Sequence, residues 1–149
     1  MNRAIIFYSK SGNTRRVAES VNVTFQGDLL AVTAENDDPN ILDPILIEAP
    51  DVKAYDHIIF ASPVHGFMLS KVMAKYLKHI DDLSDKQIDL FITHFFPFAW
   101  MGGNQTLKQM KKMIERKNGI VGSMTSVNWK SRHRESIINA LIESYRSKS

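Results

Sequence analysis

The residues best suited to chemistry are six consecutive polar ones that follow an apolar run at positions 4–8. These are Ser9, Lys10, Ser11, Gly12, Asn13 and Thr14, and a helical pattern begins directly after them. A glycine lets the backbone turn closely, and the free N–H groups at a helix start can bind a phosphate together with neighbouring hydroxyls. Ser, Thr and Asn are also ordinary helix caps, which is the simpler interpretation. Four of them at one helix start favour an anion site.

Two arginines strengthen this interpretation. Arg15 and Arg16 fall in the first helical turn, where positive charge opposes the helix dipole unless an anion compensates it. The alternative is that these long side chains bend into solvent and no anion is bound.

A second loop, residues 62–67, also carries unusual backbone chemistry. It contains Ser62, Pro63, Val64, His65 and Gly66, and it joins an apolar run to a helical pattern. Pro63 stiffens the loop, and Gly66 allows either sign of φ beside a ligand. His65 is open to two interpretations, a hydrogen-bonded structural residue or a proton donor or ring contact.

A third loop, residues 93–104, is rich in aromatic side chains. The candidate binding residues in it are Thr93, His94, Phe95, Phe96, Trp100, Gly102 and Gly103. Three Phe and one Trp exceed what a solvated connection needs. They either pack beneath the loop or stack on a flat aromatic ligand.

The three loops contain no Asp or Glu, although the chain has 16. A site without carboxylates suits an anion and a planar ring, and it does not suit a metal, paired-carboxylate catalysis or a Ser-His-Asp triad. The absence of cysteine excludes disulfides, thiolate metal sites and a Cys nucleophile.

The elements that must position these loops alternate along the chain. Apolar runs at 5–8, 29–32, 58–61, 88–92 and 120–121 predict five strands, and helical stripes at 17–25, 72–80, 107–114 and 137–145 predict four helices. Pro39, Pro44 and Pro50 interrupt the crossover at 35–56, which we expect to be irregular, with room only for a short helix around 41–47. This alternation predicts one α/β domain over residues 1–149, with a parallel sheet and helices on both faces.

Composition sets the broad class. No run of about 18 apolar residues and no signal peptide is visible, and a cytoplasmic protein without a membrane span is expected. The net charge of +3 permits weak attraction to anions but is too small to indicate nucleic-acid binding. The chain does not reveal its oligomeric state.

The segment 5–14 resembles the FMN-phosphate signature of flavodoxins, a Thr/Ser-x-Ser/Thr-Gly-x-Thr pattern after the first strand. Residues 61–67 and 93–104 occupy the places of that family's two further flavin loops. The resemblance implies a flavodoxin-like three-layer fold, a five-stranded sheet in the order 2-1-3-4-5 and FMN at the edge where the order reverses. It also implies that Ser9 to Thr14 bind the phosphate, that the other two loops flank the ring, and that Gly66 permits a peptide flip.

The resemblance implies an electron carrier with a non-covalent flavin, whose partner is a redox protein or a small-molecule acceptor. Flavodoxins that carry single electrons are usually acidic, whereas this chain is basic. We therefore expect a tendency toward two-electron chemistry. The alternatives are an FMN-dependent oxidoreductase acting on a quinone or porphyrinogen and a flavodoxin-fold interaction module without cofactor.

Overall fold

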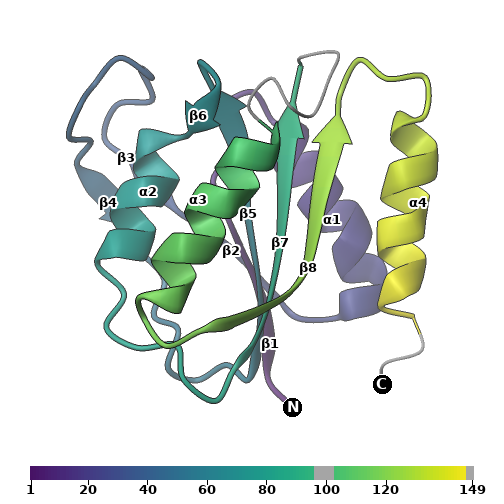
Figure 1. Ribbon diagram of the computed structural model, residues 1–149, viewed down its shortest axis with the longest axis horizontal. Coiled ribbons are helices and arrows are strands. Elements are labelled where there is room, and N and C mark those ends of the chain that lie inside the picture. Colours follow the sequence, from purple (N-terminus) through teal and green to yellow (C-terminus); the bar gives the residue numbers. More distant parts are fainter. Residues whose placement is uncertain (96–102, 147–149) are drawn as a thin grey trace.

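A five-stranded parallel sheet forms the centre of the protein. A computed structural model of the chain describes residues 1–95 and 103–146 (Figure 1). The main strands are β1 (Arg3–Phe7), β2 (Asp28–Ala31), β5 (His57–His65), β7 (Gln87–His94) and β8 (Ile120–Asn128), in the order β2-β1-β5-β7-β8. The predicted order 2-1-3-4-5 is confirmed.

Helices cover both faces of this sheet, as Figure 1 shows. One face packs against α1 (Asn13–Phe25) and α4 (Arg134–Ser144), and the other against α2 (Lys71–Lys78) and α3 (Gly103–Glu115). The central strands are apolar on both sides because neither side meets water. Along β5, for example, Ile59 belongs to the core under α1 while Phe60 belongs to the core under α2.

The second crossover contains no helix, so the room that the prolines leave for a short one around 41–47 is not used. The segment is irregular, as expected, apart from β4 (Leu46–Glu48), which pairs antiparallel with β3 (Thr33–Ala34). Pro44 disfavours helical geometry at the residue before it and has no N–H to donate. An extended segment can instead find backbone partners beside the end of β2.

A buried polar network lies at the amino edge of the sheet, on the face covered by α4. Asp89 of β7 accepts hydrogen bonds from the Tyr145 hydroxyl and the Ser123 N–H, and its carboxylate lies 2.8 Å from His57 Nε2. The Ser123 N–H belongs to an irregularity in β8, where the register with β7 shifts. Asp89 thus joins α4, β5 and β8 through one carboxylate.

Burial alone would raise the pKa of Asp89, but hydrogen bonds from His57, Ser123 and Tyr145 outweigh it and lower the pKa to about 2. A Cβ at Gly122 would lie 2.8 Å from Asp89 Oδ1, so the bulge requires a glycine there. Burial and Asp89 together raise the pKa of Tyr145, which remains a neutral donor.

The opposite, carboxyl edge of the sheet gathers the loops that carry the candidate chemistry. Because β1, β5 and β7 are parallel neighbours, their carboxyl ends lie side by side, and the ends of β5 and β7 are at the top of Figure 1. Within residues 1–95 and 103–146, no helix has the length and apolar character needed to cross a membrane.

Candidate functional site

The start of α1 lacks a side-chain cap. Gly12 has a φ of +95°, and α1 begins at the next residue. Ser9 Oγ accepts hydrogen bonds from the N–H groups of Gly12 (3.1 Å) and Arg15 (3.2 Å), so it holds the loop in shape. Nothing in the described part of the chain accepts a hydrogen bond from the N–H groups of Asn13 or Thr14. These donors lie at the positive end of the helix dipole.

The side chains around this helix start divide into two groups. Lys10, Ser11 and Gly12 are exposed, and Asn13 is half-buried. Thr14 is buried, and its Oγ1 lies 2.8 Å from Thr93 Oγ1. The Thr14 hydroxyl therefore joins the first loop to the third, which leaves its backbone N–H as the group available to an anion.

The second loop is a short hairpin. The end of β5 turns at Gly66 and Phe67 and returns as β6 (Met68–Leu69). Both turn residues have positive φ, +55° and +70°, which is the geometry of a tight two-residue hairpin. Phe67 adopts this conformation although it is not a glycine, and strain of this kind accumulates at functional sites. A Cβ at Gly66 would meet no atom within 4 Å.

Ser62 and Pro63 support this hairpin from below. The Ser62 hydroxyl is buried, donates to the Pro63 carbonyl and lies 2.8 Å from Ser70 Oγ. Ser70 Oγ in turn caps α2 by accepting from Met73 N–H. The structure thus places the Ser62 side chain in the interior, where it fixes the start of α2 against the loop, and Pro63 lies beside Thr93 in register.

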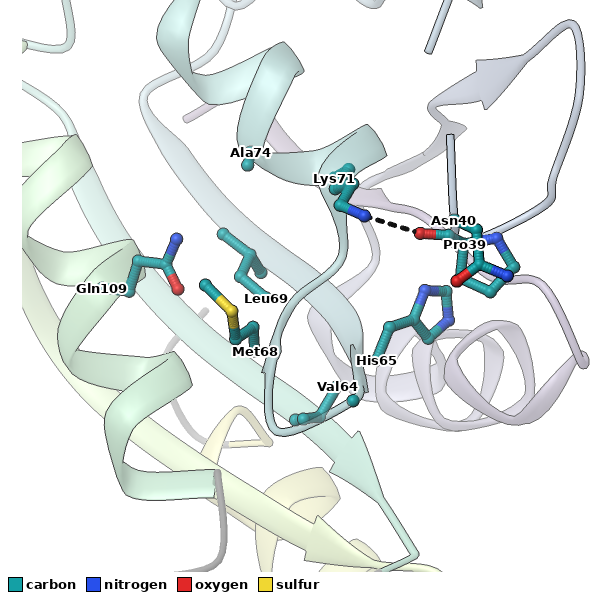
Figure 2. A pocket seen from close by; sticks show the side chains of 10 residues that line it. Pro39, Asn40, Val64, His65, Met68, Leu69, Lys71, Ala74 and Gln109 are labelled. Atoms are coloured by element: carbon teal, nitrogen blue, oxygen red, sulfur yellow. Dashed lines mark hydrogen bonds between the residues drawn. The ribbon is translucent and has the colours of Figure 1, made fainter. Parts of the chain in front are cut away.

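His65 lies at the mouth of a pocket of about 500 Å³. Figure 2 shows its imidazole close to Pro39 and Asn40 of the second crossover, and it also shows Lys71 donating to the Pro39 carbonyl at 2.9 Å. The pocket is lined further by Val64, Met68, Leu69 and Gln109. Its walls are mostly apolar, with a few polar groups at the mouth, as small-molecule sites usually are.

The surroundings of His65 lower the pKa of its imidazole. Its pKa is lowered by burial and by the positive charge of Lys10, which outweigh the opposing effect of Asp37, while Lys71 lowers it further. The ring also packs edge-on against Tyr8, with centroids 6.1 Å apart. Tyr8 donates to Asp37 at 3.2 Å, and burial together with that carboxylate raises its pKa to about 12.

The third loop is described only at its ends. His94 is buried, and Gly103 packs against it so closely that a Cβ there would lie 3.6 Å from the His94 ring and 3.0 Å from Ser126 Oγ. Phe95 is 47% exposed. The predicted contacts Phe96, Trp100 and Gly102 lie outside the described residues.

Comparison with known proteins identifies the fold family. A family model described as the flavodoxin domain matches residues 4–122, most of the chain. The chain belongs to the flavodoxin family. A search of curated proteins finds no match.

Solved flavoprotein structures share the fold of this flavodoxin at low sequence identity. A flavodoxin of Streptococcus pneumoniae TIGR4 is 18% identical with a TM-score of 0.67, and each chain is covered completely. A flavoprotein of Lactobacillus acidophilus, solved in complex with FMN, is 17% identical with a TM-score of 0.68 and 97% coverage of both chains. A putative flavoprotein of Bacteroides eggerthii is 16% identical with a TM-score of 0.71, again with 97% coverage of both chains.

In this flavodoxin, sequence reasoning missed the residues that reach the site from the second crossover. Asp37, Pro39 and Asn40 lie beside His65, so a carboxylate approaches an edge whose three loops contain none. A signal was present, because the turn-forming run 36–40 follows β2, whose carboxyl end lies at this same edge. Within the described residues, no group of three His, Asp or Glu side chains could hold a metal.

The link between Thr14 and Thr93 gives the flavodoxin a test of how its loops are joined. Thr14→Val is expected to lower the free energy of unfolding of the flavin-free protein by about 1–2 kcal/mol, because the buried Thr93 hydroxyl loses its partner. Thr93→Val should cost a similar amount, and the double variant less than the sum. Urea unfolding measures all three. Strict additivity would mean that the two hydroxyls do not interact.

Proposed function

We propose that this flavodoxin binds FMN non-covalently and carries electrons through it. The uncapped start of α1 is the observation that carries the proposal, because the N–H groups of Asn13 and Thr14 have no other partner among the described residues. A dianionic phosphate matches these donors and the helix dipole. A Cβ at Gly12 would meet nothing within 4 Å, so the space beside the loop is open.

The residues divide the work of binding between them. Ser11 and the N–H groups of Asn13 and Thr14 hold the phosphate, Ser9 keeps the loop in shape by accepting from Gly12, and exposed Lys10 adds positive charge nearby. Thr14 and Thr93 tie this loop to the third, so phosphate and ring sites keep a constant separation. The hairpin at 62–66 and the segment at 93–95, with Gly103 behind it, flank the ring.

The flavin supplies the redox chemistry when bound, and the protein sets its surroundings. Burial and Lys10 lower the pKa of His65, which favours its neutral form, and the neutral imidazole keeps one N–H to donate. The Gly66–Phe67 turn, with two positive φ values, is where a backbone peptide can change orientation. The buried Ser62–Ser70 pair holds the base of that turn still.

One observation favours a second function, an FMN-dependent oxidoreductase. The pocket of about 500 Å³ beside His65 is large enough for an organic substrate, with apolar walls at Val64, Met68 and Leu69. A quinone or a porphyrinogen suits such walls. The absence of acidic residues from the three flavin loops favours transfer of two electrons, since negative charge there would oppose full reduction.

The deciding experiment is the absorption spectrum of the purified protein, followed by titration of the flavin-free protein with FMN. Flavin bands and tight uptake of FMN are expected. A colourless protein that takes up no FMN would leave an interaction module as the function. Turnover of quinones or a porphyrinogen by the loaded protein would favour the oxidoreductase, and its absence the carrier.

A further inference from the structure

A cluster of positive side chains lies beside the phosphate site, where two elements distant in sequence meet. It consists of Arg15, Arg16, Lys130, Arg132 and Arg134, and we call it the basic rim. Arg15 and Arg16 belong to the first turn of α1, Lys130 and Arg132 to the segment between β8 and α4, and Arg134 is the first residue of α4. Trp129 joins the two parts, because the guanidinium groups of Arg16 and Arg134 lie 5.7 and 4.6 Å from the centre of its ring.

Aromatic rings hold most of these cations in place. The Arg15 guanidinium lies 4.8 Å from the centre of the Phe7 ring, and Lys130 Nζ lies 5.9 Å from that of Phe95. Arg134 also donates to the Trp129 carbonyl at 2.9 Å. Cation–π contacts of this kind orient the charges before any ligand arrives.

The charge of the basic rim is poorly neutralised within the chain. Among the described residues its only ion pair joins Arg134 to Glu135 at 3.3 Å, and Arg15, Arg16, Lys130 and Arg132 form none. Arg15 and Arg16 also lie at the positive end of the α1 dipole, which disfavours positive charge there. An external anionic group would relieve this repulsion.

Exposed apolar side chains continue the same edge of the sheet. Phe95 contacts Lys130 and is 47% exposed, and the hairpin residues Phe67 and Met68 are 49% and 61% exposed. Exposed apolar residues beside a group of charges are common in protein–protein interfaces, and here the contact between Lys130 and Phe95 joins the two kinds of surface. Nucleic acid would require a larger positive charge and no such apolar surface.

We propose that the carboxyl edge of the sheet docks a protein with an acidic surface, whose carboxylates contact the basic rim while its apolar residues cover Phe67, Met68 and Phe95. An acidic electron carrier pairs with basic partners. The basic rim of this chain is positive, so it selects partners with an acidic surface. The role of the docked protein as an electron-transfer partner rests on the proposed function. The docking surface itself does not.

The test uses an acidic b-type cytochrome as the probe, with a basic c-type cytochrome for comparison. Binding to the full chain is measured by isothermal titration calorimetry at low and high salt, with and without added FMN. The acidic probe is expected to bind at low salt and to lose about tenfold in affinity at high salt, because salt screens rim charges. The basic probe is expected not to bind.

Charge reversal locates the surface. The double variant Lys130→Glu/Arg132→Glu is expected to weaken binding of the acidic probe about tenfold or more at low salt. The matched control Lys112→Glu/Arg116→Glu makes the same change of charge at the far end of α3 and should weaken it less than threefold. Met68→Gln tests the apolar part and should weaken binding severalfold without changing its salt dependence.

Three results would overturn the inference: equal losses in the two double variants, preference for the basic probe, or tighter binding of a short DNA duplex than of the acidic cytochrome. Failure of FMN binding alone would remove the proposed function and leave the docking result intact. If the chain binds FMN but the Lys130→Glu/Arg132→Glu variant binds the acidic probe as tightly as the original chain, the docking surface is disproved and the proposed function is not.

Discussion

Replacing Ser11 by Asp is expected to weaken FMN binding about a hundredfold, which corresponds to about 3 kcal/mol. Ser11 is exposed in the loop whose N–H groups at Asn13 and Thr14 have no partner within the described residues. A carboxylate there would repel the phosphate and would also accept those N–H groups itself, as acidic caps do. Fluorescence quenching on titration of FMN into the flavin-free protein measures the affinity.

Two comparisons make this result specific to the phosphate. In Ser11→Asn the new side chain is nearly the same size as Asp but carries no charge. This variant should change the affinity for FMN only severalfold. Riboflavin has no phosphate, so its weaker affinity should be the same in the Asp variant and in the original chain. If the Asp variant binds FMN as tightly as the original chain, the phosphate does not lie at residues 9–14.

The second large effect is expected at the opposite edge of the sheet, where Asp89→Ala should lower the free energy of unfolding by about 3 kcal/mol. Asp89 is 8% exposed, and its removal leaves His57, the Tyr145 hydroxyl and the Ser123 N–H without their shared acceptor. Urea unfolding monitored by circular dichroism measures the loss. Tyr145→Phe removes one of the three contacts and should cost about 1 kcal/mol.

The pH dependence of stability gives an independent reading of the same carboxylate. The pKa of Asp89 falls from 3.8 to about 2 on folding, so its ionisation stabilises the folded state above pH 4. That contribution, about 2 kcal/mol, is lost as the pH falls from about 4 to about 2. Asp89→Asn is therefore expected to flatten this part of the stability profile. An unchanged acid profile would show that Asp89 is not ionised in the fold.

FMN affinity provides the control for the Asp89 variants. The network lies at the amino edge, while the phosphate loop lies at the carboxyl edge, so a folded Asp89→Asn protein should bind FMN as the original chain does. A large loss of affinity in that variant would indicate that the two edges are coupled through the sheet.

The regular elements were predictable because their patterns are local. The apolar runs at 58–61 and 88–92 lie within β5 and β7, and the stripe at 107–114 lies within α3. The crossover at 35–56 was correctly expected to be irregular, because its prolines disfavour a long helix, but the strand pairing within it was not predictable. Its conformation depends on β3, which happens to offer backbone partners.

The Asp89 network and the basic rim were not predictable, because both consist of residues that lie far apart in the sequence. His57, Asp89 and Tyr145 are 32 and 56 residues apart along the chain, and no sequence pattern links them. Arg16 and Arg134 meet at Trp129 only because α1 and α4 pack on the same face.

By itself, the sequence determined the alternation of strands and helices and the position of the loop at residues 9–14, because spacing and residue type act locally there, whereas the strand order came from the resemblance to flavodoxins. Only the tertiary structure decided which groups of that loop are free. In the folded protein the Thr14 hydroxyl contacts Thr93, and Ser9 accepts a hydrogen bond from the loop. The Asn13 and Thr14 N–H groups have no partners among the described residues. The partner of a hydroxyl depends on which distant segment packs against it, and that contact exists only once the sheet has formed.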